Sequence, residues 1–111
     1  MPTPHLPPPA VRRALRKLGG DIRVARLSRR LPMEVVAERA STSRPTVSRI
    51  EKGDHTVSIG LYASVLHALD LLKGLSDLAD PSQDSVGLAR SIAALPKRAR
   101  LSRKTKAGKD G

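Results

Sequence analysis

The sequence predicts an all-α protein built around one five-helix domain. Apolar residues recur at spacings of three and four along most of the chain, and no segment shows the strict alternation of a half-buried strand. The chain has 111 residues, the size of one ordinary domain, and no cysteine, so neither disulfides nor thiolate metal sites are expected. A domain of this size has a small core, and association with a second copy would stabilise it.

The first three predicted helices follow from their apolar faces and their boundaries. Residues 11–29 place apolar side chains on one stripe, and a proline then ends this helix and opens a second over residues 33–40. The segment "STS", residues 41–43, is expected to form a turn. The third helix spans residues 44–52 and ends at Gly53, which tolerates the left-handed conformation of a helix C-terminus.

The second half of the chain continues in helices. Ser58 suits the N-cap of a fourth helix over residues 59–71, and a short fifth helix is predicted over residues 75–79. A last helix is predicted over residues 84–95, ended by Pro96.

These helices and the composition of the termini predict four segments. Residues 1–10 are a proline-rich, disordered lead-in, and residues 11–79 are the main domain. Residues 80–96 are a C-terminal helical extension, and residues 97–111 are a basic, disordered tail.

The charge is distributed unevenly along the chain. Of the formal net charge of +11, residues 1–52 carry +8, residues 53–96 carry −3 and residues 97–111 carry +6. This asymmetry favours a polyanionic partner, most simply nucleic acid, over the alternative that the charge only aids solubility. Tyr62 is the only aromatic residue, so base stacking on aromatic side chains is not expected, whereas contact with a DNA duplex is.

Several other functions are not indicated. No apolar run approaches the roughly 20 residues that span a bilayer, and the N-terminal stretch "MPTPHLPPPA" lacks the apolar core of a signal peptide. We therefore expect a cytoplasmic protein without a membrane partner. His5, His55 and His67 lack metal-ligand spacing, and no nucleophile motif or phosphate-binding glycine loop occurs. We expect no metal, no cofactor and no enzymatic activity.

The segment "SRPTVSRIEKG", residues 43–53, carries the strongest functional signal. On a helical wheel its basic and small residues share one side: Arg44, Pro45, Ser48, Arg49 and Lys52. Its only large apolar residues, Val47 and Ile50, lie on the other side, three residues apart. The helix therefore docks by a narrow seam and leaves a broad polar, basic face outside, as expected of a helix that enters a DNA groove.

The start of this helix is predicted to be capped in one particular way. Pro45 is tolerated because the first amides of a helix have no intrahelical acceptor. Ser43 suits the N-cap position. Because Pro45 has no N–H, the Ser43 hydroxyl must accept its hydrogen bond from the amide of Thr46.

The segment "MEVVAERASTSRPTVSRIEKG" resembles the helix-turn-helix of the Cro/repressor-type (XRE) regulators. The likeness includes Ala37, Ser43, Val47, Ile50, Glu51 and Gly53 and extends over about residues 18–71. It implies a lambda-repressor-like fold whose third helix lies in the major groove of double-stranded DNA. Ser41 departs from the family, in which glycine is common at this turn, at the cost of a little strain. A helical bundle used only for protein contacts is the alternative.

The resemblance also implies which residues contact DNA. Arg44, Pro45 and Arg49 resemble base-facing residues, and arginine can pair bidentately with guanine. The remaining residues resemble contacts to phosphate or to an occasional base edge: Arg30, Met33 (through its amide), Ser43, Thr46, Ser48, Lys52 and Thr56. For each cation the alternative is a solvated surface charge.

Glu51 stands among cations, and the resemblance implies its role. Related sequences pair this glutamate with an arginine of the first helix, here Arg26, as a structural ion pair. An unpaired cation at Arg26, on the apolar stripe, would be costly. Arg29 also falls near that stripe, so the helical wheel alone does not choose between the two arginines.

The second half suggests association and a more specific relationship. Six apolar residues are candidates for a homodimer interface, with closure of the monomer core as the alternative: Leu71, Leu72, Leu75, Leu78, Leu88 and Ile92. The stretch "DLADPSQDSVGLARSIAALPKRAR" is similar to the C-terminal extension of HipB-type antitoxins, which neutralise a HipA-type serine/threonine kinase toxin and repress their operon. A stand-alone XRE regulator without a toxin partner is the alternative.

Overall fold

The computed structural model describes residues 6–87 and residue 90, and the chain divides into two compact units, Met1–Ser76 and Asp77–Gly111. The predicted tail over residues 97–111 and most of the predicted helix over residues 84–95 lie outside the described residues. Within that helix, residues 85–87 and residue 90 are helical.

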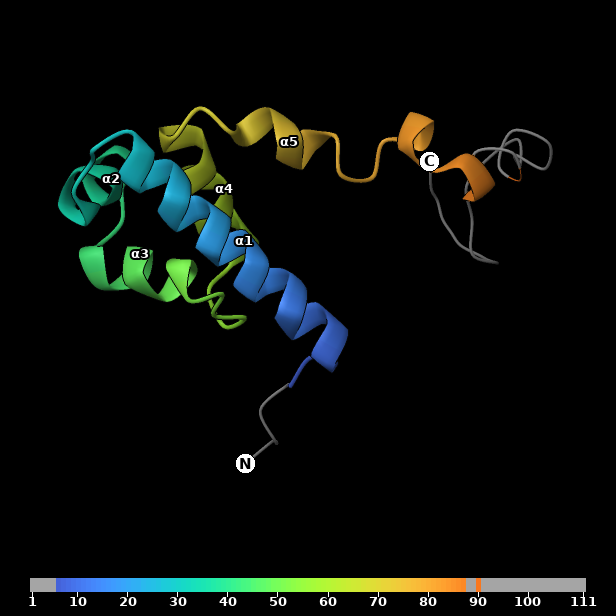
Figure 1. Ribbon diagram of the computed structural model, residues 1–111, viewed down its shortest axis with the longest axis horizontal. Coiled ribbons are helices and arrows are strands. Elements are labelled where there is room, and N and C mark those ends of the chain that lie inside the picture. Colours follow the sequence, from blue (N-terminus) through green and yellow to red (C-terminus); the bar gives the residue numbers. More distant parts are fainter. Residues whose placement is uncertain (1–5, 88–89, 91–111) are drawn as a thin grey trace, which may run out of the picture. The chain divides into compact units, whose positions relative to one another are not determined.

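All regular structure in the described part of the chain is helical, which confirms the predicted all-α class. The first unit contains α1 (Pro9–Ser28), α2 (Met33–Arg39), α3 (Arg44–Glu51), α4 (Ile59–Ala68) and α5 (Leu72–Ser76) (Figure 1). The second unit contains a short 3-10 helix, η1 (Pro81–Gln83).

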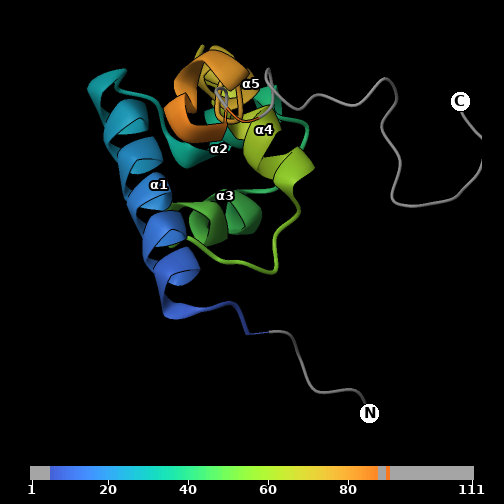
Figure 2. The ribbon, with the colours of Figure 1, turned by 90° about the vertical axis from the view of Figure 1, so that its right-hand side faces the viewer.

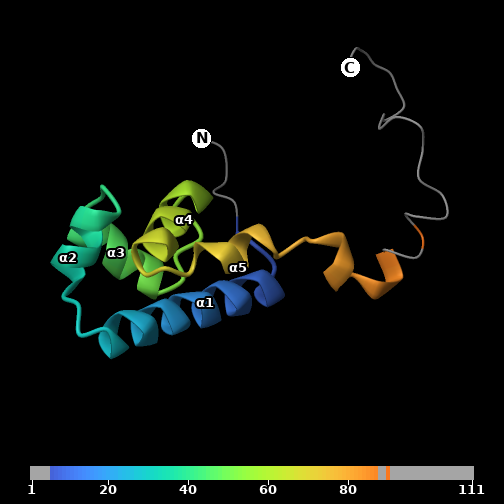
Figure 3. The same ribbon diagram turned by 90° about the horizontal axis from the view of Figure 1, so that it is seen from above.

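The helices of the first unit enclose one small core. α3 packs against both α1 and α2, α2 also packs against α4, and α5 packs against α4. α1 runs along one side of the group formed by α2, α3 and α4 (Figures 2 and 3). The core consists of buried residues from α1 to the end of α4: Ile22, Val36, Ala37, Ala40, Val47, Ile50, Val57, Tyr62, Val65, Leu66 and Leu69.

Four helices end in a residue with left-handed backbone conformation. The residues and their φ angles are Arg30 (55°), Ser41 (56°), Gly53 (73°) and Asp70 (61°). The helices close with the hydrogen bonds of a Schellman motif, as in the 2.9 Å bond from the Thr42 amide to the Ala37 carbonyl after α2. Outside glycine this conformation costs about 1–2 kcal/mol per residue, so the strain expected at Ser41 is present, and Arg30 and Asp70 share it.

Several predicted boundaries are wrong. α1 begins at Pro9, inside the predicted lead-in, because proline is favoured in the first helical turn, where its missing N–H costs nothing. α4 ends at Ala68 instead of residue 71, because the left-handed Asp70 stops the helix. α5 then covers Leu72–Ser76 instead of residues 75–79.

Gly19 and Gly53 allow α1 and the end of α3 to approach closely. A Cβ atom on Gly19 would lie 2.5 Å from the carbonyl oxygen of Ile50 and 2.7 Å from the amide nitrogen of Gly53. A Cβ atom on Gly53 would lie 2.6 Å from the carbonyl oxygen of Leu15. The backbones leave no room for a methyl group at either position. By contrast, a Cβ atom on Gly20 would meet nothing within 4 Å.

The neighbouring glycines of α1 therefore provide a matched pair of variants. We expect Gly19→Ala to lower the free energy of unfolding by about 1–3 kcal/mol, because α3 must shift to admit the methyl group. Gly20→Ala should raise it by about 0.5–1 kcal/mol, because alanine is the better helix former. Chemical denaturation followed by circular dichroism measures both values, and effects of the same sign would contradict the close contact.

Candidate nucleic-acid interface

α3 buries its apolar seam and presents its basic side to solvent, as the helical wheel predicts. Val47 and Ile50 are fully buried in the core. The outer side carries the exposed residues Arg44, Pro45, Arg49 and Lys52, with Ser48 partly covered. α3 and its C-cap residue Lys52 thus offer three exposed cations along one side.

The N-terminus of α3 is capped as predicted. The amide of Thr46 donates to Ser43 Oγ at 3.3 Å, and the two hydroxyl oxygens lie 3.0 Å apart. Because the two side chains also bond to each other, Ser43 and Thr46 together fix the start of the helix.

Arg44 is held loosely by a carboxylate of α2. Its Nε lies 3.3 Å from Glu34 Oε2, and the two side chains are 60% and 68% exposed. An exposed pair of this kind contributes at most about 1 kcal/mol. Arg44 can therefore exchange Glu34 for a phosphate or a base edge at little cost.

Arg49 is held more firmly, by the loop that follows α3. Its Nε donates to Asp54 Oδ2 at 2.8 Å, and its Nη2 donates to Thr56 Oγ1 at 2.7 Å. The other carboxylate oxygen, Asp54 Oδ1, accepts from the Thr56 amide at 2.8 Å and from the Thr56 hydroxyl at 2.6 Å. Hydrogen bonds from Thr56 and from Arg49 hold the pKa of Asp54 far below its usual range, so the carboxylate is ionised at neutral pH.

Tyr62 ties the same loop to α4. Its hydroxyl donates to the backbone carbonyl oxygen of Asp54 at 2.8 Å. The ring belongs to the core, and burial is the main cause that raises the pKa of Tyr62. The loop that holds Arg49 is thus anchored in the core through its backbone.

The phosphate contact predicted for Thr56 would require some of its present hydrogen bonds to break. Both donors of Thr56, the amide and the hydroxyl, are bonded to Asp54 Oδ1, and its hydroxyl oxygen accepts from Arg49. A phosphate oxygen needs a donor, and Thr56 has none left in this conformation. Its observed contacts place it as a support for Arg49.

Arg26 and Glu51 form a buried ion pair between α1 and the last residue of α3. Arg26 Nε lies 2.6 Å from Glu51 Oε2 and Arg26 Nη2 lies 3.1 Å from Glu51 Oε1. The two residues are 7% and 8% exposed. Arg26 Nη1 also donates to the Leu31 carbonyl oxygen at 3.0 Å. The hydrogen bond to Glu51 is the main cause that raises the pKa of Arg26.

Arg29, the other arginine near the apolar stripe, has a different role. It is exposed, and its Nη1 donates to the Ala25 carbonyl oxygen of its own helix at 2.9 Å. The helical wheel does not choose between the two arginines, and the structure shows that Arg26 is the one paired with Glu51.

Two further predicted DNA contacts lie around the junction of α1 and α2. Arg30 is exposed at the left-handed end of α1. The Met33 side chain packs partly against the core, while its amide lies in the first turn of α2, where helix N–H groups have no intrahelical acceptor.

The residues predicted to form a homodimer interface lie in different environments. Leu75 packs against the core of the first unit, as expected if it helps to close the monomer core. Leu71 and Leu72, in the same unit, are exposed, as is Leu78 in the second unit. Leu88 and Ile92 lie outside the described residues. Large apolar residues outside the predicted interface are also exposed, among them Val24 and Leu27 on α1.

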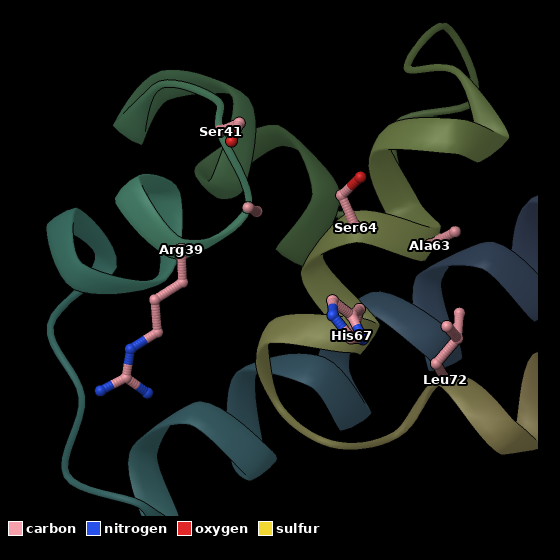
Figure 4. A pocket seen from close by; sticks show the side chains of 7 residues that line it. Arg39, Ser41, Ala63, Ser64, His67 and Leu72 are labelled. Atoms are coloured by element: carbon pink, nitrogen blue, oxygen red, sulfur yellow. The ribbon is translucent and has the colours of Figure 1, made fainter.

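A pocket of about 400 Å³ lies away from the basic side of α3, between the end of α2, α4 and the start of α5. It is lined by Arg39, Ala40, Ser41, Ala63, Ser64, His67 and Leu72. In Figure 4 the Arg39 guanidinium lies apart from the other labelled side chains. His67 is the histidine of this lining, which contains no carboxylate.

No helix in the described part of the chain is both long enough and apolar enough to cross a bilayer. The same residues contain no cluster of three or more histidine, cysteine, aspartate or glutamate side chains that can hold a metal ion.

Residues 17–78 match the family described as a helix-turn-helix domain. The match covers more than half of the chain, and the protein therefore belongs to this family. The matched segment contains α2, the turn and α3, the helices that the likeness to XRE regulators identifies as the DNA-binding motif. No curated protein and no solved structure matches the chain.

The Arg26–Glu51 pair predicts a large difference between two identical substitutions. Glu51→Ala should lower the free energy of unfolding by about 3–5 kcal/mol, because it leaves a buried guanidinium without its counter-charge. Glu34→Ala breaks an exposed pair and should cost less than about 1 kcal/mol. Denaturant titration of both variants measures the difference, and comparable small losses would show that the buried pair contributes little.

Proposed function

We propose that the protein is a sequence-specific DNA-binding transcriptional repressor. The observation that carries the proposal is the exposed basic side of α3, the second helix of a helix-turn-helix, docked on the core by Val47, Ile50 and Glu51. Such a helix fits the major groove, where arginine side chains contact base edges. The net charge of +8 on residues 1–52 supplies the attraction to phosphates.

Within this proposal, Arg44 and Arg49 contact bases and Pro45 contributes an apolar contact, for instance to a thymine methyl group. Ser48 and Lys52 contact phosphates beside the groove. Arg30 and the Met33 amide provide further backbone contacts, from the junction before α2. Localisation at the nucleoid in the cytoplasm follows from this function.

The protein is further proposed to act as a homodimer. Helix-turn-helix proteins commonly match their own two-fold axis to two DNA half-sites about 34 Å apart. Of the residues in the proposed interface that the structure describes, Leu71, Leu72 and Leu78 are exposed. The first two belong to the unit that contains α3, and Leu78 belongs to the second unit.

Selection of duplexes from a random pool tests the DNA-binding proposal. We expect a preferred sequence with two half-sites. Arg44→Ala and Arg49→Ala should each weaken binding to that sequence about 10- to 100-fold, because each removes a base contact. Lys52→Ala should weaken binding to all sequences and lower the salt dependence of binding by about one unit.

Lys73→Ala is the matched control, because it removes one exposed cation of α5 without altering α3. It should leave sequence preference unchanged. Absence of any preferred sequence, with Arg44→Ala and Arg49→Ala indistinguishable from the unaltered chain, would favour a module used only for protein contacts.

The finer proposal is an antitoxin of the HipB kind with a HipA-type serine/threonine kinase toxin as its partner. It is supported by the sequence likeness of the segment that starts at Asp77, most of which lies outside the described residues. The alternative is a stand-alone XRE regulator.

The gene next to this one distinguishes the two. If it encodes a kinase, co-expression should yield a stable complex on affinity purification, and the complex should suppress phosphorylation by the kinase. A neighbour without kinase features, or a kinase that neither co-purifies nor is inhibited, would leave the stand-alone regulator.

A further inference from the structure

Arg49 uses one edge of its guanidinium group to bond the loop that follows α3. A guanidinium is planar and carries five N–H groups in a fixed fork. Nε and one N–H of Nη2 form one edge, and these two groups bond to Asp54 Oδ2 and Thr56 Oγ1. Nη1 and the second N–H of Nη2 form the outer edge, which takes no part in these two bonds.

The two bonds determine the direction of that outer edge. Two hydrogen bonds to one side of a planar group fix both its position and the orientation of its plane. The Arg49 side chain is 50% exposed, so the group is held at the surface and not withdrawn into the core. Two parallel N–H groups at the outer edge match the O6 and N7 acceptors of guanine.

The support of Arg49 is itself rigid. Asp54 Oδ1 binds the amide and the hydroxyl of Thr56, which sets the carboxylate's orientation. Tyr62, buried in the core, donates to the Asp54 carbonyl oxygen and anchors the backbone of the same residue. The path from core to guanidinium is therefore continuous and made of hydrogen bonds between 2.6 and 2.8 Å.

We propose that Asp54 is a positioning residue for base recognition: it holds one edge of Arg49, together with Thr56, and so directs the outer edge toward a guanine. This inference rests on the proposed DNA-binding function and adds the base class and the residue that enforces it. Asp54 acts through Arg49 and need not touch DNA.

A positioning role and a purely electrostatic role have opposite signatures. Asp54 carries a negative charge beside the basic side of α3, so its removal strengthens attraction to phosphates on every sequence equally. If Asp54 positions Arg49, its removal instead weakens the preference for guanine at a single base pair, because the freed side chain can adopt other orientations. Relative binding at each position of the site therefore separates the two roles.

Asp54→Asn is the main variant, because the retained Oδ1 can still accept from the Thr56 amide and keep the loop closed. Thr56→Val is the second variant, since it keeps the branched shape and removes the acceptor for Nη2. Asp70→Asn is the control: it removes one negative charge at the end of α4, where Asp70 makes no side-chain hydrogen bond within the described residues. Thermal unfolding verifies that each variant is folded.

The test measures base preference with the full chain on a random duplex pool. We expect a guanine preference at one position of each half-site that Arg49→Ala abolishes. Asp54→Asn and Thr56→Val should each reduce it about tenfold, while Asp70→Asn leaves it unchanged. In the Arg49→Ala background, Asp54→Asn should have no further effect on that position.

Two results would overturn the inference alone. One is a guanine preference that survives Asp54→Asn and Thr56→Val while affinity rises on all sequences. The other is a site in which no guanine preference depends on Arg49. A chain with no sequence preference at all would instead reject the DNA-binding function, and the positioning role with it.

Discussion

The ion pair between Arg26 and Glu51 determines how α3 is presented. Glu51 is the last residue of α3, and Arg26 lies in the last turn of α1, so the pair joins the two helices at one point. The same guanidinium bonds the Leu31 carbonyl oxygen in the connection to α2. Apolar contacts such as that of Val47 permit sliding and rotation, whereas two hydrogen bonds to a carboxylate have direction. The pair therefore fixes the rotation of α3 about its axis, and with it which residues face outward.

The backbone contact at Gly19 complements the ion pair. The ion pair with Arg26 sets the orientation of α3, and the absence of a side chain at Gly19 allows the backbones of α1 and α3 to approach closely. Both constraints act on the residues around Ile50 and Gly53. The basic side of α3 can thus be polar throughout, because its position depends on a few buried atoms near its C-terminus and not on a wide apolar face.

The sequence predicted the parts of this arrangement that depend on local rules. The cap of Ser43 on Thr46 follows from the missing amide of Pro45, and the left-handed Gly53 follows from glycine's freedom at a helix end. Residues 44–52 were assigned to a helix within one residue of the observed end, because their periodicity and both boundaries agree. The choice of Arg26 over Arg29 came from family likeness, since both lie near the same stripe of α1.

The remaining features depend on contacts between distant segments. The local sequence indicates only that Gly19 weakens its helix. Its close contact with α3 could not be predicted, because the contacting residues lie more than thirty positions later in the chain. The hydrogen bonds of Thr56 could not be predicted, because they depend on the direction of the Asp54 carboxylate, which Tyr62 and Arg49 help to set. The predicted C-terminal end of α4 and the predicted position of α5 are wrong because no glycine marks the end of α4, where Asp70 takes the left-handed conformation.

The left-handed residues at the helix ends have a consequence for engineering this domain. Ser41 and Asp70 lie at the ends of two different helices, α2 and α4, and glycine at either position is expected to relieve its backbone strain. A more heat-resistant scaffold is therefore reachable without altering the outer side of α3. Arg30 is different, because glycine there would also delete a cation of the proposed DNA-contacting set. Glycine at Ser41 or Asp70 is thus expected to raise thermal stability without removing a predicted DNA contact, whereas glycine at Arg30 is expected to raise stability and weaken DNA binding.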